Sequence, residues 1–250
     1  MTQSSFLTTL QGRRIAYRKI EGTGPGLVFL GGFKSDMQGV KATHLEDWAG
    51  ARGRTFVRFD YSGHGESSED FLDGSVADWA EDAHQVITRL TEGPQILIGS
   101  SMGGWISLLM SKRMPERIAG LVTIAAAPDF TEDMYWAGFT DAQRTRLLDE
   151  GRIAVPSEYG APYVITRRLI EEGRRTLVLR DPLHLPFPVR FLQGTCDEDV
   201  DISVALRLLG HATGPDIRLI CLKDADHRFS SEDGLRLIED AIANVLERIG

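Results

Sequence analysis

The sequence has few cysteines and no long apolar run, and both absences narrow the class of protein. Its 250 residues include two cysteines, Cys196 and Cys221, which give neither a disulfide framework nor the spacing of a metal site. The longest apolar stretch, Leu121–Ala127, is too short to cross a bilayer, and the first ten residues do not resemble a secretory leader. We therefore expect a cytoplasmic protein without a membrane anchor or a bound metal.

The sequence also lacks a basic patch. The formal net charge is -8 at pH 7, and no run of lysine and arginine could follow a phosphate backbone. Nucleic acid and anionic membranes are therefore not expected as partners. Hydrophobic residues make up 42% and charged residues 26% of the chain, as in ordinary soluble proteins. Nothing in the composition indicates an oligomeric state.

The chain does contain a strand-like segment that ends in small residues. The apolar run Gln95–Ile98 is followed by Gly99, Ser101 and Gly103, and the apolar segment Ile106–Met110 comes next. This is the strand, turn and helix of a G-x-S-x-G nucleophile elbow, in which the serine is exposed on a tight turn. Side chains two positions to either side of that serine would clash with the backbone. The sequence therefore predicts Ser101 as a nucleophile.

Two backbone amides are candidates for holding an oxyanion beside this serine. Met102 opens the helix, so its N–H has no intrahelical acceptor. In folds with such a nucleophile elbow, the second donor comes from the loop after an earlier strand, here the strand 26–30. The N–H of Phe33 is the expected donor in that loop. The two glycines before Phe33 are also compatible with an ordinary tight turn. Ser100 is the alternative nucleophile, which the glycine spacing disfavours.

Strand-like and helix-like segments alternate along most of the chain. Strands are expected at 14–20, 26–30, 55–59, 95–98, 118–126, 189–192 and 217–222, and helices at 40–52, 76–90, 106–110, 202–209 and 231–249. Repeated β-then-α units predict an α/β protein with a mostly parallel sheet covered by helices on both faces. We expect one domain over residues 1–250.

The alternation stops between residues 129 and 186. There, 155–162 is typical of a turn or hairpin, and 163–175 is predicted to be a helix. An insertion of this length in an α/β domain is often a lid. Its apolar cluster could line an acyl pocket, although packing of the lid on the core is the more frequent role. The cluster comprises Met134, Tyr135, Trp136 and Phe139.

The same insertion is rich in arginine. The residues concerned are Arg167, Arg168, Arg174 and Arg175. They could attract an anionic leaving group. Because Glu171 and Glu172 are interleaved with them, a solvated helix face is the more ordinary interpretation.

A serine hydroxyl needs a base, and in this fold the chain order is nucleophile, acid and histidine. Of the six histidines, only His227 lies after a late strand and before the last helix. His64 lies in a glycine-rich loop and could help to shape the site. His84 lies in the middle of a helix, where a surface role is expected. His227 is therefore the predicted base.

The acid is expected in the loop after the strand 189–192, since the carboxyl ends of parallel strands meet at one edge of a sheet. Asp197 is in the usual place, and Asp199 is the main alternative. A solvated acidic turn would explain the same residues. Asp224 and Asp226 are too close in sequence to the histidine to be its partner, and we expect them to cap or solvate that loop.

Together these motifs resemble the α/β-hydrolase superfamily over nearly the whole chain. More narrowly, the chain is similar to bacterial relatives of the mitochondrial palmitoyl-protein thioesterase and mycophenolic acid acyl-glucuronide esterase group. The matching stretches are Gly32–Met37, Lys41–Ala42, Arg58–Gly63, Gly93–Leu97, Gly99–Ser101, Pro156–Ser157 with Tyr159, and Asp226–Arg228. Three features depart from the group: there is no targeting segment, Asp201 replaces a common proline, and the lid matches least.

The resemblance implies an α/β-hydrolase fold with a triad of Ser101, Asp197 and His227. It also implies hydrolysis of carboxyl esters or thioesters, of the acyl-thioester or acyl-glucuronide type, through an acyl-serine and without a metal or cofactor. Carbon–carbon bond hydrolysis by the same triad and a non-catalytic ligand-binding role stay open. The sequence identifies neither the acyl group nor the leaving group.

Overall fold

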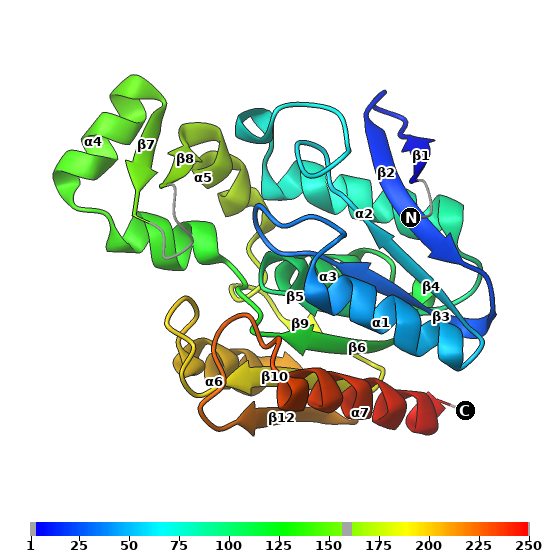
Figure 1. Cartoon of the computed structure of the whole chain (residues 1–250). Coiled ribbons are helices and arrows are strands. Elements are labelled where there is room, and N and C mark those ends of the chain that lie inside the picture. Colours follow the sequence, from blue (N-terminus) through cyan, green and yellow to red (C-terminus); the bar gives the residue numbers. More distant parts are fainter. Residues whose placement is uncertain (1–3, 157–161, 250) are drawn as a thin grey trace.

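The computed structural model describes residues 4–156 and 162–249, which form a central sheet flanked by helices (Figure 1). The eight strands of the sheet lie in the order β1-β2-β4-β3-β5-β6-β10-β12, and only the pairs β1–β2 and β2–β4 are antiparallel. Their bounds are β1 (Ser5–Thr8), β2 (Arg14–Ile20), β3 (Thr23–Leu30), β4 (Arg54–Phe59), β5 (Gln95–Ser100), β6 (Ile118–Ile124), β10 (Val189–Gly194) and β12 (Ile217–Leu222). The predicted mostly parallel sheet is confirmed.

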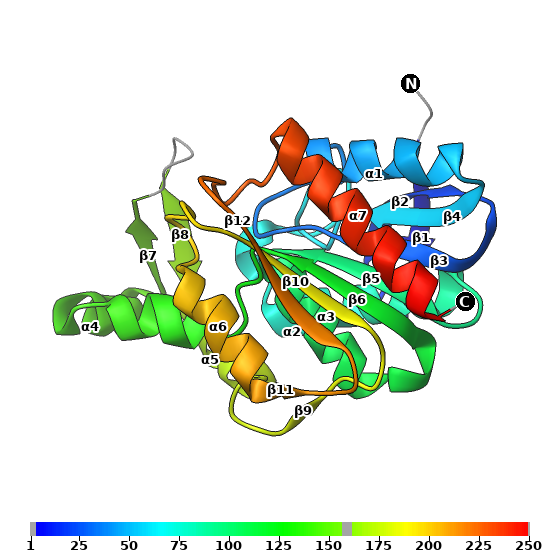
Figure 2. The same cartoon turned by 90° about the horizontal axis from the view of Figure 1, so that it is seen from below.

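Helices cover both faces of this sheet (Figure 2). The helices are α1 (Val40–Ala51) and α7 (Glu232–Ile249) on one face, and α2 (Val76–Leu90), α3 (Met102–Arg113) and α6 (Ile202–His211) on the other. Successive side chains of a strand point to opposite faces, so Ile96 and Ile98 of β5 pack with α1 and α7, whereas Leu97 packs with α2 and α3. Such burial on both faces explains why the central strands are apolar throughout.

Helix α2 illustrates how the sequence sets its own boundaries. Ser75 precedes the helix with extended backbone, and its hydroxyl accepts the N–H of Asp78, which is the geometry of an N-cap. Val76, Trp79 and Val86 lie on one side of the helix and are fully buried. The apolar stripe therefore predicted both the limits of this helix and its buried face.

Between β6 and β10 the chain leaves the sheet and builds the insertion, which lies beyond the carboxyl ends of the parallel strands (Figure 1). Its elements are η3 (Thr131–Trp136), α4 (Asp141–Glu150), β7 (Arg152–Val155), β8 (Tyr163–Thr166), α5 (Arg167–Gly173), η4 (Arg174–Thr176) and β9 (Leu183–His184). Strands β7 and β8 form an antiparallel hairpin, and β9 pairs with β11 (Ala212–Thr213). Of the predicted turn at 155–162, residues 157–161 lie outside the described residues.

One prediction for the insertion is wrong. The segment 163–175 does not form one helix, because Tyr163–Thr166 is strand β8 and α5 begins at Arg167. The strand contains three β-branched residues and pairs with β7, and the Thr166 hydroxyl then accepts the N–H of Leu169 as an N-cap. Pairing with a partner strand thus overrides the local helical pattern. Within the described part of the chain, no helix combines the length and apolar character needed to span a membrane.

Candidate active site

Ser101 lies at the sharp turn between β5 and α3, with φ 53° and ψ -116°. Such a positive φ is strained for a residue other than glycine and must be held by its surroundings. The Ser101 N–H donates to the carbonyl of Ile124 at 2.9 Å, and its own carbonyl accepts the N–H groups of Gly104 and Ala127 at 2.9 and 3.1 Å. These three backbone hydrogen bonds fix the serine at the end of the sheet.

The glycines around Ser101 are required by close backbone approach. A Cβ added to Gly99 would overlap the carbonyl of Gly103, and a Cβ added to Gly103 would overlap the carbonyl of Leu30 on the neighbouring strand. Only glycine lets α3 start this close to β5 and β3. The steric reason expected from the sequence for these two positions is thus present in the fold.

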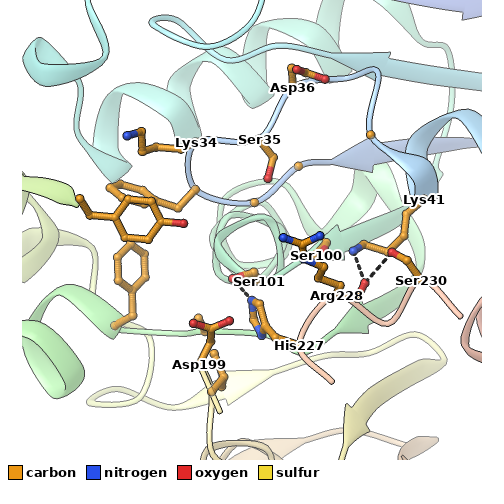
Figure 3. A pocket seen from close by; sticks show the side chains of 18 of the residues that line it. Lys34, Ser35, Asp36, Lys41, Ser100, Ser101, Asp199, His227, Arg228 and Ser230 are labelled. Carbon is orange, nitrogen blue, oxygen red and sulfur yellow. Dashed lines mark hydrogen bonds between the residues drawn. The ribbon is translucent and has the colours of Figure 1, made fainter. Parts of the chain in front are cut away.

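The three predicted side chains meet at the carboxyl edge of the sheet. His227 Nε2 lies 3.1 Å from Ser101 Oγ. Figure 3 marks this contact with a dashed line. His227 Nδ1 lies 2.9 Å from Asp197 Oδ2 and 3.1 Å from Oδ1. The imidazole therefore bridges the hydroxyl and the carboxylate, with one ring nitrogen toward each. This arrangement lets a proton leave the serine while the carboxylate stabilises the resulting imidazolium.

The Asp197 carboxylate is held on all sides. Its side chain has 0% exposure. Oδ1 accepts the N–H groups of Asp199 at 3.0 Å and Val200 at 2.8 Å, and Oδ2 accepts the side-chain amide of Gln193 at 2.9 Å. The alternative acid, Asp199, thus supports Asp197 through its backbone. Asp201, the departure from the resembling group, is the N-cap of α6, where its carboxylate accepts the Ser203 N–H.

The loop that carries His227 is tied to distant parts of the chain. The Asp226 carboxylate accepts the Phe229 N–H at 3.0 Å, which is the capping role expected of it. The Asp224 N–H donates to the hydroxyl of Thr195. The carbonyl of Arg228 accepts both the Lys41 ammonium and the Ser230 hydroxyl (Figure 3). These bonds keep the histidine loop against α1 and the acid loop.

The two predicted oxyanion donors lie on either side of the serine. Met102 is the first residue of α3, so its N–H has no intrahelical acceptor. A Cβ built on Gly32 would lie 3.5 Å from Ser101 Cβ, which places the Gly32–Phe33 turn directly against the nucleophile. Among the described residues, no hydrogen bond is formed by the Phe33 N–H. Both amides are therefore available to a bound group.

His64 supports the loop that carries Phe33. Its Nδ1 lies 3.1 Å from the Ser62 carbonyl, and its Nε2 lies 3.3 Å from the Lys34 amide, which donates to it. Burial lowers the pKa of His64 from 6.5 to about 4, although the Ser62 carbonyl opposes this shift. The ring is therefore neutral near pH 7, so that Nε2 can accept while Nδ1–H donates. The glycine-rich loop thus contributes a structural support to the site.

A cavity of about 680 Å³ opens onto Ser101 and His227. One wall is apolar and aromatic. The Phe33 ring lies edge-on to the rings of Phe130 and Tyr163, with centroids 5.7 and 5.6 Å away, and Met134 and Tyr135 of the insertion complete the wall. An acyl chain would find low-polarity surface on this side.

Two of the four apolar residues predicted to line the pocket do not line it. Trp136 lies outside, with the guanidinium of Arg174 4.4 Å from its ring centroid. Phe139 is buried behind Tyr135, on whose ring it stacks. The prediction is therefore corrected for these two, because Trp136 packs against Arg174 and Phe139 packs behind the Tyr135 ring. Met134 and Tyr135 face the cavity.

The arginines of the insertion form ion pairs away from this cavity. The pairs are Arg167 with Glu171, Arg168 with Asp78, Arg174 with Glu132, and Arg175 with Glu172. None of these arginines lines the cavity. The more ordinary interpretation of this segment, a solvated helix face, is therefore the one that fits.

One group of metal-ligating side chains occurs in the described residues, and it overlaps the triad. Ligand atoms of Asp197, Asp199 and His227 lie within 4.8 Å of one another. Two of the three are already bonded to each other, and Asp197 accepts two further backbone amides. This donor set suits a proton relay better than a metal ion, which would need these lone pairs.

Four residues of the cavity wall were not predicted as site residues: Lys41, Phe130, Tyr163 and Arg228. Lys41 and Arg228 lie in stretches that match the resembling group, and Arg228 directly follows the predicted histidine. Lys41 reaches the site from a helix that is distant in sequence, so its residue type alone does not indicate a role there. Phe130 and Tyr163 are ordinary apolar residues until the insertion folds over the sheet edge.

Comparison with known proteins places this chain in a family. The family described as serine aminopeptidase, S33, matches residues 27–154. The mitochondrial palmitoyl-protein thioesterase ABHD10 of Mus musculus is 32% identical over 98% of this chain and 83% of its own length. The crystal structure of a protein from Agrobacterium vitis S4 aligns with a TM-score of 0.93 and 36% identity, covering 97% of this chain and 98% of that one.

The mouse α/β hydrolase domain-containing protein 10 has also been solved. It aligns with a TM-score of 0.93 and 30% identity over the full length of both chains. The α/β-hydrolase fold is therefore shared with both of these solved structures over nearly the whole chain. The chain belongs to the serine aminopeptidase S33 family of α/β hydrolases and is a relative of the ABHD10 thioesterases.

Proposed function

We propose that this hydrolase cleaves carboxyl esters or thioesters through an acyl-Ser101 intermediate. The observation that supports the proposal best is the continuous contact from Ser101 Oγ to His227 Nε2 at 3.1 Å and from His227 Nδ1 to Asp197 at 2.9 Å. In this geometry His227 removes the proton of the attacking hydroxyl, and Asp197 orients and stabilises the imidazolium.

The N–H groups of Phe33 and Met102 hold the tetrahedral oxyanion in this mechanism. The Phe33 N–H belongs to the loop after β3, and the Met102 N–H belongs to the first residue of α3. Because the fold holds both backbone segments in place before a substrate binds, the two donors need little reorganisation during the reaction. His227 then donates its proton to the leaving oxygen or sulfur. In the second half it activates a water molecule, which releases the acyl group from Ser101.

The aromatic wall supports an acyl group with apolar character. Phe33, Phe130 and Tyr163 offer ring edges and faces, and Met134 offers a flexible side chain that adapts to different chain lengths. The mouse relative is named a palmitoyl-protein thioesterase, and a palmitoyl group is an apolar acyl group of this kind. We propose apolar acyl groups on an ester or thioester, with the insertion acting as the lid that selects them.

Hydrolysis of a panel of 4-nitrophenyl esters and acyl-thioesters tests the proposal. The wild-type protein should turn over at least one ester, and Ser101→Ala should lower kcat by about 10⁵-fold or more. Circular dichroism should show that the variant is folded. A fluorophosphonate should label the wild type and not the variant. Unchanged hydrolysis by Ser101→Ala, or a protein inert to both ester and fluorophosphonate, would contradict the proposal.

A further inference from the structure

A buried glutamine contacts the acid of the proposed triad. Gln193 is the penultimate residue of β10 and has 0% exposure, and Asp197 follows in the loop after that strand. The side-chain nitrogen Nε2 of Gln193 lies 2.9 Å from Asp197 Oδ2 and 3.0 Å from the carbonyl oxygen of Val200. One amide group therefore binds both the acid and the end of the acid loop.

The contacts of this amide determine which of its two ends carries the nitrogen. Three oxygens face it, from the Asp197 carboxylate and from the carbonyls of Gly194 and Val200, and a backbone carbonyl can only accept a hydrogen bond. The Gln193 Oε1 is buried, and it has no hydrogen-bond partner among the described residues. An apolar side chain of similar size would avoid the cost of a buried unpaired oxygen, but it could not donate to Asp197.

The two oxygens of the Asp197 carboxylate are held by different groups. Oδ1 accepts the backbone N–H groups of Asp199 and Val200. Oδ2 accepts the Gln193 amide, and the same oxygen is the one closer to His227 Nδ1, at 2.9 Å. Because both oxygens are held, the carboxylate cannot rotate freely about its Cβ–Cγ bond, and Oδ2 stays directed at the imidazole.

We propose that Gln193 is a positioning residue of the triad, whose amide keeps Asp197 Oδ2 directed at His227 Nδ1. The inference rests on the proposed function, to which it adds a residue that does not line the cavity. Its substitution should therefore leave substrate binding nearly unchanged. The affected step is formation of the imidazolium, because a misdirected carboxylate stabilises that charge less.

The chain offers a matched control in Gln95. This glutamine is the first residue of β5, at the end of the strand opposite Ser101, and it is 2% exposed. Its Nε2 donates to backbone carbonyls of the turn 92–94, and its Oε1 is buried without a partner among the described residues. The two glutamines thus share strand type, burial and an unpaired oxygen, but the Gln95 amide donates to no triad residue.

The test compares Gln193→Met with Gln95→Met. Methionine is unbranched, is close in size to glutamine and has no N–H to donate. Gln193→Met should lower kcat for a 4-nitrophenyl ester by about tenfold or more and leave KM within about twofold of the wild type. The rate at which a fluorophosphonate labels Ser101 should fall by a similar factor. Gln95→Met should leave kcat and the labelling rate as in the wild type, and urea unfolding should show a comparable change of stability in both variants.

A double-substitution cycle distinguishes positioning of the acid from a general loosening of its loop. If Gln193 acts through Asp197, Gln193→Met should change the labelling rate by less than about twofold in a protein that already carries Asp197→Asn. A further tenfold loss in that background would show that Gln193 supports the loop independently of the acid, which would overturn the inference. If Gln193→Met does not fold, Gln193→Leu removes the same donor and is measured in its place.

The possible results separate this inference from the function on which it rests. Wild-type kinetics in Gln193→Met, or an equal loss of kcat in Gln95→Met, would overturn the inference, and Ser101-dependent hydrolysis would still keep the proposed function intact. A raised KM with an unchanged kcat would assign Gln193 to substrate binding instead. A wild-type protein that neither hydrolyses an ester nor reacts with a fluorophosphonate would reject the function and the inference together.

Discussion

The two regions that meet at Ser101, the sheet edge and the insertion, are built in different ways. The sheet edge is held by backbone: Ser101 makes three main-chain hydrogen bonds, and Gly99 and Gly103 allow contacts that no side chain would permit. The insertion contributes side chains instead, with Met134 and Tyr135 facing the cavity. We therefore expect the sheet edge to fix the reaction and the insertion to adjust which substrate reacts. Substitutions at the sheet edge should therefore lower kcat or stability, whereas substitutions in the insertion should change the substrate preference.

The largest effect is expected from the acid at the sheet edge. Asp197→Asn should lower kcat by about 10⁴-fold, because the amide favours the wrong tautomer of His227 and cannot stabilise the imidazolium. Asp199→Asn should change kcat less than about tenfold, since Asp199 contacts Asp197 through its backbone N–H, which the substitution keeps. Steady-state kinetics on one ester compare the two. Similar losses in both would show that the acid has been misassigned.

The next largest effect is expected on the free energy of unfolding, when a glycine of each region is replaced by alanine. Gly103→Ala places a methyl group on the Leu30 carbonyl and should lower the free energy of unfolding by about 3 kcal/mol or more. Gly138→Ala, in the insertion, meets no atom within 4 Å and should change it by less than about 0.5 kcal/mol. Urea unfolding measures both. Equal stability of the two variants would refute the account of the elbow.

Acid should weaken the support of the Phe33 loop. Burial lowers the pKa of His64 from 6.5 to about 4. Between these two pH values the histidine is mostly protonated in the unfolded chain and mostly neutral in the folded protein. Stability from this group is complete above pH 6.5 and is lost as the pH falls toward 4, with about 2 kcal/mol lost between pH 7.5 and 5. His64→Gln should lose about that much less over this interval in urea titrations. Parallel pH profiles would mean that His64 is protonated as easily in the folded state.

The smallest effect is expected within the insertion. Tyr135→Ala removes a ring from the aromatic wall and so widens the cavity. It should shift the preferred acyl chain length, with changes in kcat/KM of about tenfold for individual esters. Trp136→Ala is the neighbouring control, because Trp136 packs against Arg174 outside the cavity. Profiling on esters of increasing chain length compares them. A shift in the Trp136 variant alone would reverse the assignment of the two side chains.

The sheet and its edge were accessible to sequence analysis because their signals are local. The apolar stripe of α2 gave its boundaries, and the elbow is a short motif in a strand–turn–helix setting. The loops after β10 and β12 follow from the order of strands, and the structure brings Asp197 and His227 together there. Strand β1 was missed, since four residues carry too little pattern to be distinguished from a loop.

The insertion was less accessible because its structure depends on distant partners. The segment that begins at Tyr163 is helical by local pattern, but Tyr163–Thr166 becomes a strand by pairing with Arg152–Val155. Trp136 packs against Arg174 outside the cavity, which its residue type does not indicate. The Lys41 contact with Arg228 joins residues 187 positions apart. Long-range packing of this kind leaves no periodic signal in the sequence.

The most direct test of the central claim is the covalent intermediate. Protein mixed with a reactive acyl-thioester is quenched in acid, and its peptides are examined by mass spectrometry. We expect an acyl group on Ser101 in the wild type and in Ser100→Ala, and none in Ser101→Ala. An acyl group on another residue, or turnover by Ser101→Ala at the wild-type rate, would contradict it.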